Sequence, residues 1–341
     1  MTTPTYTFTV RHSYRNLGRN GRLGNQLFQI AGTIGRAHRA GSRENAVFPP
    51  WEYARYFSIP NHHFMATSPD ERTIDGGRAY LQNLAEFDGC VDYIHQILAP
   101  SDFAIDEVAR IHPSITERPH VTAVHVRRGD YLRLPMVVTA CPVHYFTRAM
   151  DEMRERRPGT HFNVFSDDPQ WCLDHLAHTT DVTVIQPDPT YSQTQREMAD
   201  FNAMRSSSAF IISNSTYSWW AAWLANSDDV ICPDRWMNEG AQVNIEHIIP
   251  AHWQRRSIAP IGPMRTSLLL VSEGDSGYIV TDNHTRRVHH LNPLSTLLFE
   301  LCTGSNTLDD MAAVMNPLVP IDSWRTGLDE LIELGLVTGG P

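Results

Sequence analysis

The sequence contains no lysine, and this absence narrows the chemistry that the chain can perform. All 28 basic residues are arginine. A lysine amine forms Schiff bases with carbonyl substrates and with pyridoxal phosphate, and a lysine completes the phosphate loop of many nucleotide-binding proteins. These three kinds of site are therefore excluded.

Cysteine is scarce, and its five positions never form a C-x-x-C pair. The residues are Cys90, Cys141, Cys172, Cys232 and Cys302. An odd number of scattered cysteines favours neither a disulfide framework nor a zinc knuckle, and it fits a reducing compartment.

Metal-binding patterns are also missing. The 17 histidines include no H-E-x-x-H, and the adjacent pairs His62/His63 and His289/His290 are expected to point to different faces. No two aspartates stand two residues apart, so the D-x-D that holds a metal on a nucleotide diphosphate in many sugar transferases is absent. We expect no metal site, and arginine would have to supply the charge for any diphosphate.

Long apolar runs are absent as well. No window approaches the ~18 consecutive apolar residues of a membrane span, and residues 1–16 lack the apolar core of a signal peptide. The formal charge of -10 argues against a general nucleic-acid binder. We expect a soluble, cytoplasmic protein that is at most peripheral to a membrane and binds no nucleic acid.

What is present is an alternation of apolar strand-like runs with helical stretches. Strands are predicted at 6–10, 121–126, 162–166, 182–186 and 209–213, and helices at 25–38, 143–156, 195–205 and 217–226. Such alternation is typical of an α/β fold with parallel sheets.

A different pattern begins after a linker at Pro260, Gly262 and Pro263. Short strands at 268–272, 278–282 and 286–291 precede helices at 293–302, 308–314 and 323–334, the last ending at Gly335. We predict a small α+β domain of winged-helix type at 264–341. A proline-rich break at 113–119 divides the rest into domains 1–118 and 119–258.

The stretch "HVRRGD" places His125, Arg127, Arg128 and Asp130 at the carboxyl end of a predicted strand. Open α/β sheets bind ligands at this end, and arginine forks match phosphate oxygens. The alternative is a surface cluster of ion pairs after the strand.

A hydroxyl-rich loop, "SNST", joins the strand at 209–213 to a helix at 217–226. We expect Asn214, Ser215 or Thr216 to cap that helix, whose N-terminus offers N–H groups to an anion such as phosphate. The alternative is an ordinary connection in which Trp219, Trp220 and Trp223 fill the core.

A glycine-rich loop precedes the first helix. Gly18, Gly21 and Gly24 do not follow the G-x-G-x-x-G pattern, so the loop is weak as a dinucleotide fingerprint. Its backbone can nevertheless approach a sugar or phosphate closely.

Four segments together carry a family resemblance: "GRLGNQLFQIA", "HVRRGD", "VFSDD" and "ISNSTYSWWAAWL". Over residues 6 to about 255 the chain resembles glycosyltransferase family 11, the α-1,2-fucosyltransferases that use GDP-fucose. The resemblance implies a metal-independent, inverting enzyme of GT-B type, with two Rossmann-like halves facing a cleft. It implies that the enzyme uses no cofactor and takes GDP-fucose as its donor substrate.

The resemblance also assigns roles. Arg127 first and Arg128 second would hold the GDP phosphates, and Arg127 would stabilise the charge on the leaving diphosphate. We expect Asp130 to orient one of these arginines, because two adjacent guanidinium groups lower the pKa of an acid and make it a poor base. The general base itself stays unassigned, since Asp75, Glu86 and Asp88 have no motif behind them.

The remaining donor contacts come from three short stretches: His125 in the strand, Asn214, Ser215 and Thr216 on the opposite side of the diphosphate, and Gly24, Asn25 and Gln26 after the glycine loop. Asp167 or Asp168 would accept the N–H groups of the guanine edge. The alternative for Asp168 is that Asp168-Pro169 only opens a turn.

The chain also departs from the family pattern. Ser207 and Ala209 stand where cysteine and histidine are expected, and Arg22 replaces a usual glycine. Because of these changes, the resemblance does not fix the identity of the acceptor or of the transferred sugar.

The C-terminal stretch resembles the PqqD-like domains, winged-helix units that recognise the leader segment of ribosomally made peptides. In that family the peptide adds as a strand to the sheet edge and packs on the last helix. This points to 286–291 and to the face with Trp324, Leu328 and Leu331, whose spacing equally describes a core stripe.

Three hypotheses follow. The chain is a fucosyltransferase that moves fucose from a nucleotide sugar to a galactoside-type glycan, or it is a glycosyltransferase guided by a leader peptide to a peptide acceptor. The third is a non-catalytic peptide-binding protein on a degenerate transferase fold.

Overall fold

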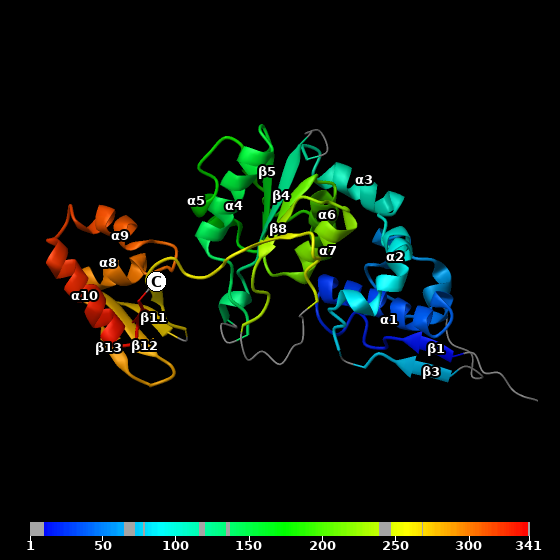
Figure 1. Cartoon of the computed structure of the whole chain (residues 1–341), viewed down its shortest axis with the longest axis horizontal. Coiled ribbons are helices and arrows are strands. Elements are labelled where there is room, and N and C mark those ends of the chain that lie inside the picture. The colour runs from blue at the N-terminus through cyan, green and yellow to red at the C-terminus, as the bar shows by residue number, and fades with distance from the viewer. Residues whose placement is uncertain are drawn as a thin grey trace, which may run out of the picture. The chain divides into compact units, whose positions relative to one another are not determined.

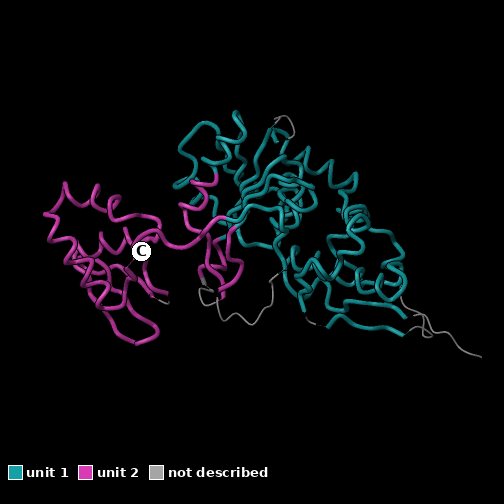
Figure 2. The backbone as a smooth tube through the Cα atoms, in the orientation of Figure 1, with its two compact units in different colours: residues 1–127, 150–232, 242–255 teal, residues 128–149, 233–241, 256–341 magenta. Residues whose placement is uncertain are grey.

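The computed structural model describes residues 10–64, 72–77, 79–115, 120–133, 137–238, 247–267 and 269–339. The chain divides into two compact units (Figure 2). The first comprises residues 1–127, 150–232 and 242–255, and the second comprises residues 128–149, 233–241 and 256–341. The predicted domain boundaries stay predictions.

The first unit begins with a small parallel sheet in the order β2-β1-β3. Its strands are β1 (Val10–Ser13), β2 (Ala46–Val47) and β3 (Arg72–Asp75), and its helices are α1 (Leu23–Arg39), α2 (Val91–Ile97) and α3 (Asp102–Ile111). Short 3-10 helices cover Arg43–Asn45, Ala54–Tyr56, Asn61–Phe64, Leu84–Glu86 and Asp88–Cys90. Helix α1 forms where apolar side chains recur at helical spacing, as at the buried Leu27, Ile30 and Ile34.

A six-stranded sheet follows, in the order β6-β5-β4-β7-β8-β9. Its strands are β4 (Val121–Val126), β5 (His161–Ser166), β6 (Val182–Val184), β7 (Ala209–Ile211), β8 (Val230–Pro233) and β9 (Gln254–Arg256). The pairs from β6 to β8 are parallel, which confirms the predicted α/β fold with parallel sheets. Counted from β4, the first five strands have the doubly wound order, which reverses between β4 and β7.

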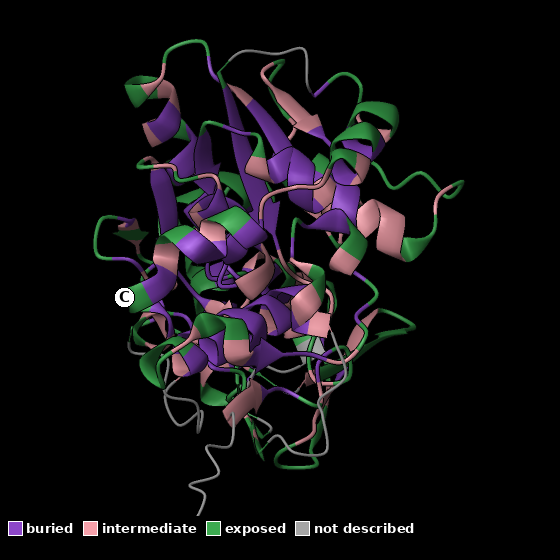
Figure 3. Ribbon diagram, turned by 90° about the vertical axis from the view of Figure 1, so that its right-hand side faces the viewer, coloured by how far each residue is buried: buried purple, intermediate pink, exposed green. Residues whose placement is uncertain are grey.

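Helices connect the strands of this sheet (Figure 1). They are α4 (Val143–Arg156), α5 (Pro169–His175), α6 (Gln193–Arg205) and α7 (Thr216–Leu224), and a 3-10 helix covers Tyr131–Arg133. Strands β4, β7 and β8 are buried along their whole length, as purple strands in Figure 3 show. A strand covered on both faces reads as a continuous apolar run, which is why β4 and β7 were recognisable from the sequence, whereas β8 was not predicted.

The predicted bounds of β4 and α4 agree with the structure, and α7 lies within two residues of its predicted range. Strand β7 ends at Ile211 rather than at residue 213, since its paired residues stop there and the chain turns, with Ser215 N donating to Ser213 O. The predicted strand at 6–10 lies outside the described residues except for Val10, where the observed strand begins.

The tryptophans of α7 belong to the core of the first unit. Trp219 and Trp220 are fully buried, and their ring centroids lie 4.7 and 4.9 Å from that of Phe28 on α1. Trp219 Nε1 also donates to Ile248 O at 2.8 Å. The core interpretation is confirmed for Trp219 and Trp220, whereas Trp223 is only partly buried. The packing of Trp219 and Trp220 on Phe28 fixes α7 against α1.

In the second unit, β11 (Leu269–Gly274), β12 (Gly277–Asp282) and β13 (Val288–His290) form an antiparallel sheet, and β10 (Met264–Arg265) pairs with β14 (Val337–Thr338). Helices α8 (Pro293–Leu301), α9 (Leu308–Met315) and α10 (Ile321–Glu333) follow the antiparallel sheet. The predicted end of α10 is confirmed, because Gly335 has a φ of 72° suited to a helix C-terminus.

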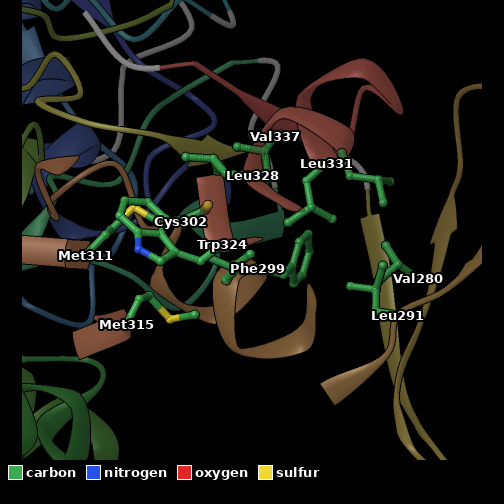
Figure 4. Close-up of a cluster of buried hydrophobic side chains, with 12 residues drawn as sticks. Val280, Leu291, Phe299, Cys302, Met311, Met315, Trp324, Leu328, Leu331 and Val337 are labelled. Carbon is green, nitrogen blue, oxygen red and sulfur yellow. The ribbon is translucent and has the colours of Figure 1, made fainter. Parts of the chain in front are cut away.

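A separate hydrophobic core joins these helices to the sheet (Figure 4). Trp324, Leu328 and Leu331 all lie in it, with exposures of 0, 5 and 1%. The core interpretation is therefore correct for all three residues, and the expectation that their face receives a peptide is wrong.

All five cysteines are buried, and none of them forms a disulfide. Among the described helices, none has both the length and the apolar character that crossing a membrane requires.

Candidate functional site

The candidate site lies at the carboxyl ends of β4 and β7, where the strand order reverses. The chain of β4 ends with His125 and Val126 and continues into Arg127, while β7 leads into the Ser213–Thr216 loop. Ser213 N donates to His125 O at 3.1 Å, which joins the two strand ends. Ligands of open α/β sheets bind in the crevice at such a reversal.

Arg127 is held by a carboxylate from the neighbouring strand end. Its Nη1 lies 3.0 Å from Asp167 Oδ2, and the two side chains are 15% and 26% exposed. A guanidinium fixed in this way is ready to meet an anion without first losing rotamer freedom. The sequence had suggested Asp130 as the orienting acid and Asp167 for the guanine edge, whereas the structure pairs Asp167 with Arg127.

His125 is 5% exposed, and its Nδ1 lies 2.9 Å from Ser213 Oγ. Burial, reinforced by the Arg127 charge, lowers the pKa of His125 to about 3. The imidazole is therefore neutral near pH 7 and cannot serve as a phosphate-binding cation. It supports the junction of β4 and β7 from within.

The loop before α7 is buried, with Asn214 2% and Ser215 7% exposed. Ser215 occupies the N-cap position, yet its side chain makes no capping hydrogen bond. The prediction that Asn214, Ser215 or Thr216 caps this helix is confirmed in position for Ser215, but the Ser215 hydroxyl does not accept a hydrogen bond from an amide of the first turn. Those amides and the helix dipole suit an anion.

Helices α1 and α7 meet at their N-termini. Thr216 Oγ1 donates to Asn25 Oδ1 at 3.0 Å, and Gln82 Nε2 donates to the same oxygen at 2.7 Å. A Cβ on Gly24 would lie 2.5 Å from both Thr216 C and Tyr217 N. Only glycine permits this approach, which explains the residue that the sequence places just before Asn25.

Gln26 was expected to contact the donor, but its side chain faces the interior of the protein. It is 3% exposed, its Nε2 donates to Gly21 O at 2.9 Å, and its Oε1 accepts from Trp51 Nε1 at 2.6 Å. Both ends of the amide are used inside the protein, so Gln26 stabilises the glycine loop.

Asp168 caps the next helix. Its carboxylate accepts from Trp171 N at 3.3 Å, with Pro169 in the first turn of α5. The turn interpretation of Asp168-Pro169 is confirmed. The contact of Asp168 with a guanine base stays a prediction.

Arg128 and Asp130 belong to the second unit. They are half-buried in the turn after β4, where Leu132 N donates to Arg128 O at 2.9 Å. Their assigned roles stay predictions.

Glu197 on α6 is a candidate that the sequence did not reveal. Tyr53 Oη donates to Glu197 Oε2 at 3.0 Å. Burial raises the pKa of Glu197, against the opposing effects of the Tyr53 hydrogen bond and of the Arg22 and Arg127 charges. No local pattern marks Glu197, because its environment depends on Tyr53, 144 residues away.

The acids considered earlier as bases are less suited. Glu86 receives hydrogen bonds from Arg36 and Arg39, and the Arg36 hydrogen bond in particular lowers the pKa of Glu86. Asp75 accepts from Arg15 N and Gly77 N in an exposed turn. Asp88 lies in a short 3-10 helix.

One cluster among the described residues has the ligand types of a metal site: Glu44, His62 and His63. The His62 and His63 ring centroids lie only 4.1 Å apart, so the expectation that they point to different faces is wrong. His63 Nδ1 faces Ala46 O at 2.7 Å and Nε2 faces the Tyr93 hydroxyl at 2.8 Å. A metal would have to displace one of these partners, which makes a packing role for His63 the better interpretation.

Comparison with known proteins identifies the family of the chain. Residues 41–254 match the model of glycosyl transferase family 11. The chain belongs to this family. The match contains Arg127, Asp167 and the loop before α7.

Two curated relatives are an α-1,2-colitosyltransferase of Escherichia coli and a galactoside α-(1,2)-fucosyltransferase 1 of Lagothrix lagotricha. The first is 27% identical over 52% of this chain and 60% of its own length, and the second is 26% identical over 62% and 65%. The chain thus spans less than two thirds of either relative. A crystal structure of the fucosyltransferase NodZ from Bradyrhizobium is similar with a TM-score of 0.44 and 11% identity, over 67% of this chain and 96% of that one.

Proposed function

We propose that this family 11 member transfers fucose from GDP-fucose to a hydroxyl of a galactoside-type glycan, with inversion and without a metal ion. Family membership supports glycosyl transfer, and the two curated relatives are named for α-1,2-colitosyl and α-(1,2)-fucosyl transfer. The absence of lysine and of D-x-D in the sequence leaves the diphosphate to arginine.

The observation that carries the proposal is the Arg127–Asp167 pair at the strand-order reversal, beside the N-terminus of α7. When the bond between the sugar and the diphosphate breaks, its electron pair remains on the phosphate oxygen. Arg127, assisted by Arg128, and the first-turn amides of α7 would stabilise that charge. By comparison with the loss of one oxyanion donor, removing Arg127 would cost about 3 to 4 kcal/mol.

The remaining donor contacts extend this site. Asn214, Ser215 and Thr216 would approach the diphosphate from the α7 side, and Asn25, whose Oδ1 is already occupied, has its Nδ2 donors for a sugar hydroxyl. Asp167 would accept a guanine N–H while it holds Arg127. Domains 1–118 and 119–258 would be the two Rossmann-like halves, with the acceptor on the side of the first.

The experiment is a transfer assay with GDP-fucose and free galactosides, in the presence and absence of EDTA. GDP-mannose and UDP-galactose serve as competing donors. We expect a fucosylated product only with GDP-fucose, at an EDTA-independent rate, and NMR of the product gives the linkage and anomer. If only another donor gave product, the proposal that fucose is the transferred sugar would be contradicted. Loss of activity with EDTA would contradict a metal-independent reaction.

A second candidate is transfer to a ribosomally made peptide, guided by residues 264–341 as a PqqD-like domain. This domain has a core of its own, and β13 lies at an edge of its described sheet, where a peptide strand can add. Peptides encoded beside the gene would be tested as acceptors with and without their leader segments. Leader-dependent transfer would favour this candidate over a free glycan acceptor, and binding without any transfer would favour a non-catalytic role.

A further inference from the structure

The transfer reaction needs a group that removes the proton from the acceptor hydroxyl, and Arg127 and the α7 amides cannot do this because they only donate. The group must be an acceptor of protons that lies near the diphosphate site and faces space for a second substrate. Glu197 on α6 is a described acid whose carboxylate is influenced by the Arg127 charge and accepts a side-chain hydrogen bond at only one oxygen.

Glu197 lies within electrostatic reach of the donor site, because the Arg127 charge acts on its carboxyl group. Its backbone is anchored there as well, since the Tyr217 hydroxyl of α7 donates to Glu197 O. Tyr217 is the second residue of α7, next to Thr216. The position of Glu197 is thus fixed relative to the proposed diphosphate site.

The Glu197 carboxylate has one oxygen engaged and one available. The Tyr53 hydroxyl donates to Oε2 at 3.0 Å, and among the described residues no other side chain donates a hydrogen bond to this carboxylate. Burial and the neighbouring Glu197 raise the pKa of Tyr53, so Tyr53 stays protonated and keeps donating. Tyr53 therefore orients Glu197 and leaves Oε1 to accept from a substrate.

A polar cavity of about 480 Å³ lies at the N-terminal end of α6, about one turn before Glu197. Thr194 and Gln195 line it, and Thr194 shares a helix face with Glu197 at i, i+3. Glu52 also lines the cavity and is close enough to raise the pKa of Glu197. Phe103 adds an apolar wall beside the polar lining residues, a combination that suits a saccharide.

We propose that Glu197 is the general base of the transfer, with the acceptor saccharide in this cavity; the proposal rests on the fucosyltransferase function above. The acceptor hydroxyl loses its proton to Glu197 Oε1 as its oxygen forms a bond to the sugar anomeric carbon. The bond from that carbon to the diphosphate breaks, and its electron pair leaves with GDP. Atoms and charges balance without an oxidant, a reductant or a metal.

The charges around Glu197 suit this role. Burial and Glu52 raise the pKa of Glu197, whereas the Tyr53 hydrogen bond, Arg22 and Arg127 lower it, and the net shift is upward. A carboxylate with a raised pKa is a stronger base than an ordinary glutamate.

The test compares Glu197→Gln with Asp200→Asn in steady-state transfer from GDP-fucose to a galactoside. Asp200 lies on the same helix and pairs with His112 at 2.7 Å, so it controls for changes to a half-buried carboxylate of α6. We expect Glu197→Gln to lower kcat at least about 100-fold with an unchanged Kd for GDP, and Asp200→Asn to change kcat less than about fivefold. Glu197→Asp should recover part of the rate, and melting curves verify that each variant is folded.

The pH profile supplies a readout that a structural role would not move. The rate should rise as Glu197 loses its proton, so kcat of the wild type has an acidic limb that Glu197→Gln lacks. Glu52→Gln removes a like charge and should shift that limb to lower pH, whereas Tyr53→Phe removes a stabilising hydrogen bond and should shift it to higher pH.

The results distinguish a failure of the proposed role of Glu197 from a failure of the proposed transferase function. If Glu197→Gln keeps kcat within tenfold with its acidic limb intact, or loses only GDP affinity, the role of Glu197 is refuted while the transferase function stands. If the wild type transfers no sugar from any donor, the proposed function fails first.

Discussion

The substitution Gly24→Ala tests the contact between α1 and α7 on which the proposed donor site depends. The added Cβ would lie 2.5 Å from Thr216 C and Tyr217 N, about 0.9 Å closer than the 3.4 Å at which ordinary contacts begin. Both atoms belong to the backbone, so neither can rotate away, and the N-terminus of α7 has to move. Overpacking of this size costs about 1 to 3 kcal/mol.

A matched substitution separates stability from binding. Gly35→Ala on the same helix would place a Cβ 1.9 Å from Glu86 O, eleven residues along α1 from the contact of Gly24 with the N-terminus of α7. We expect both variants to be less stable in urea unfolding by about 1 to 3 kcal/mol. Only Gly24→Ala should also weaken GDP binding, by at least about tenfold, because it alone displaces the amides of α7.

Calorimetry of GDP binding can refute the contribution of the α7 N-terminus to the diphosphate site. If calorimetry gives Gly24→Ala the same GDP affinity as Gly35→Ala and the wild type, the N-terminus of α7 does not contribute to the diphosphate site. Equal stability of Gly24→Ala and wild type would instead show that the close approach relaxes at no cost.

Two further predictions concern stability. Trp219→Phe should destabilise the protein by about 1 to 2 kcal/mol more than Trp220→Phe in urea unfolding, because Trp219 Nε1 donates to Ile248 O while Trp220 Nε1 is a buried atom without a partner; equal losses would refute the value assigned to that hydrogen bond. His125 keeps a pKa of about 3 in the folded state against 6.5 in the unfolded chain, so the unfolded chain binds the extra proton and stability falls with decreasing pH from about 6.5 towards 3. The loss should reach about 1.4 kcal/mol per pH unit, and His125→Asn should lack this contribution in unfolding curves measured across that range; an unchanged slope would contradict the buried neutral histidine.

Much of the sheet was predictable because its strands are apolar on both faces and its helices have strong end signals. The strand at 121–126 and the helix at 143–156 were read with the bounds that the structure has. The strand order and its reversal were not predicted, and the anion site expected from the location of Arg127 after β4 stays a prediction.

Contacts between distant residues were not predictable. The pairing of Arg127 with Asp167 was missed, because Asp130 was expected to orient one of the two arginines. Only the parallel pairing of β4 with β5 brings Asp167 to Arg127. Gln26 reads as a polar residue beside a glycine loop, and its burial depends on Trp51.

Helix faces were equally ambiguous where two uses share one spacing. The i, i+4, i+7 pattern of Trp324, Leu328 and Leu331 describes both a core stripe and a docking face, and the position of α8 decides for the core. Glu197 shows the limit most clearly, because its character as a base comes from burial and from charges on three other segments.

The most direct test of the central claim is calorimetric binding of GDP-fucose without added metal to wild type, Arg127→Ala and Arg154→Ala. Arg154 is the matched control, since it pairs with Asp181 at 2.7 Å before β6, at the amino end of the sheet. Wild type and Arg154→Ala should bind with similar affinity, and Arg127→Ala should bind at least about 100-fold more weakly. Equal binding by Arg127→Ala would contradict an arginine-held diphosphate at the junction of β4 and β7.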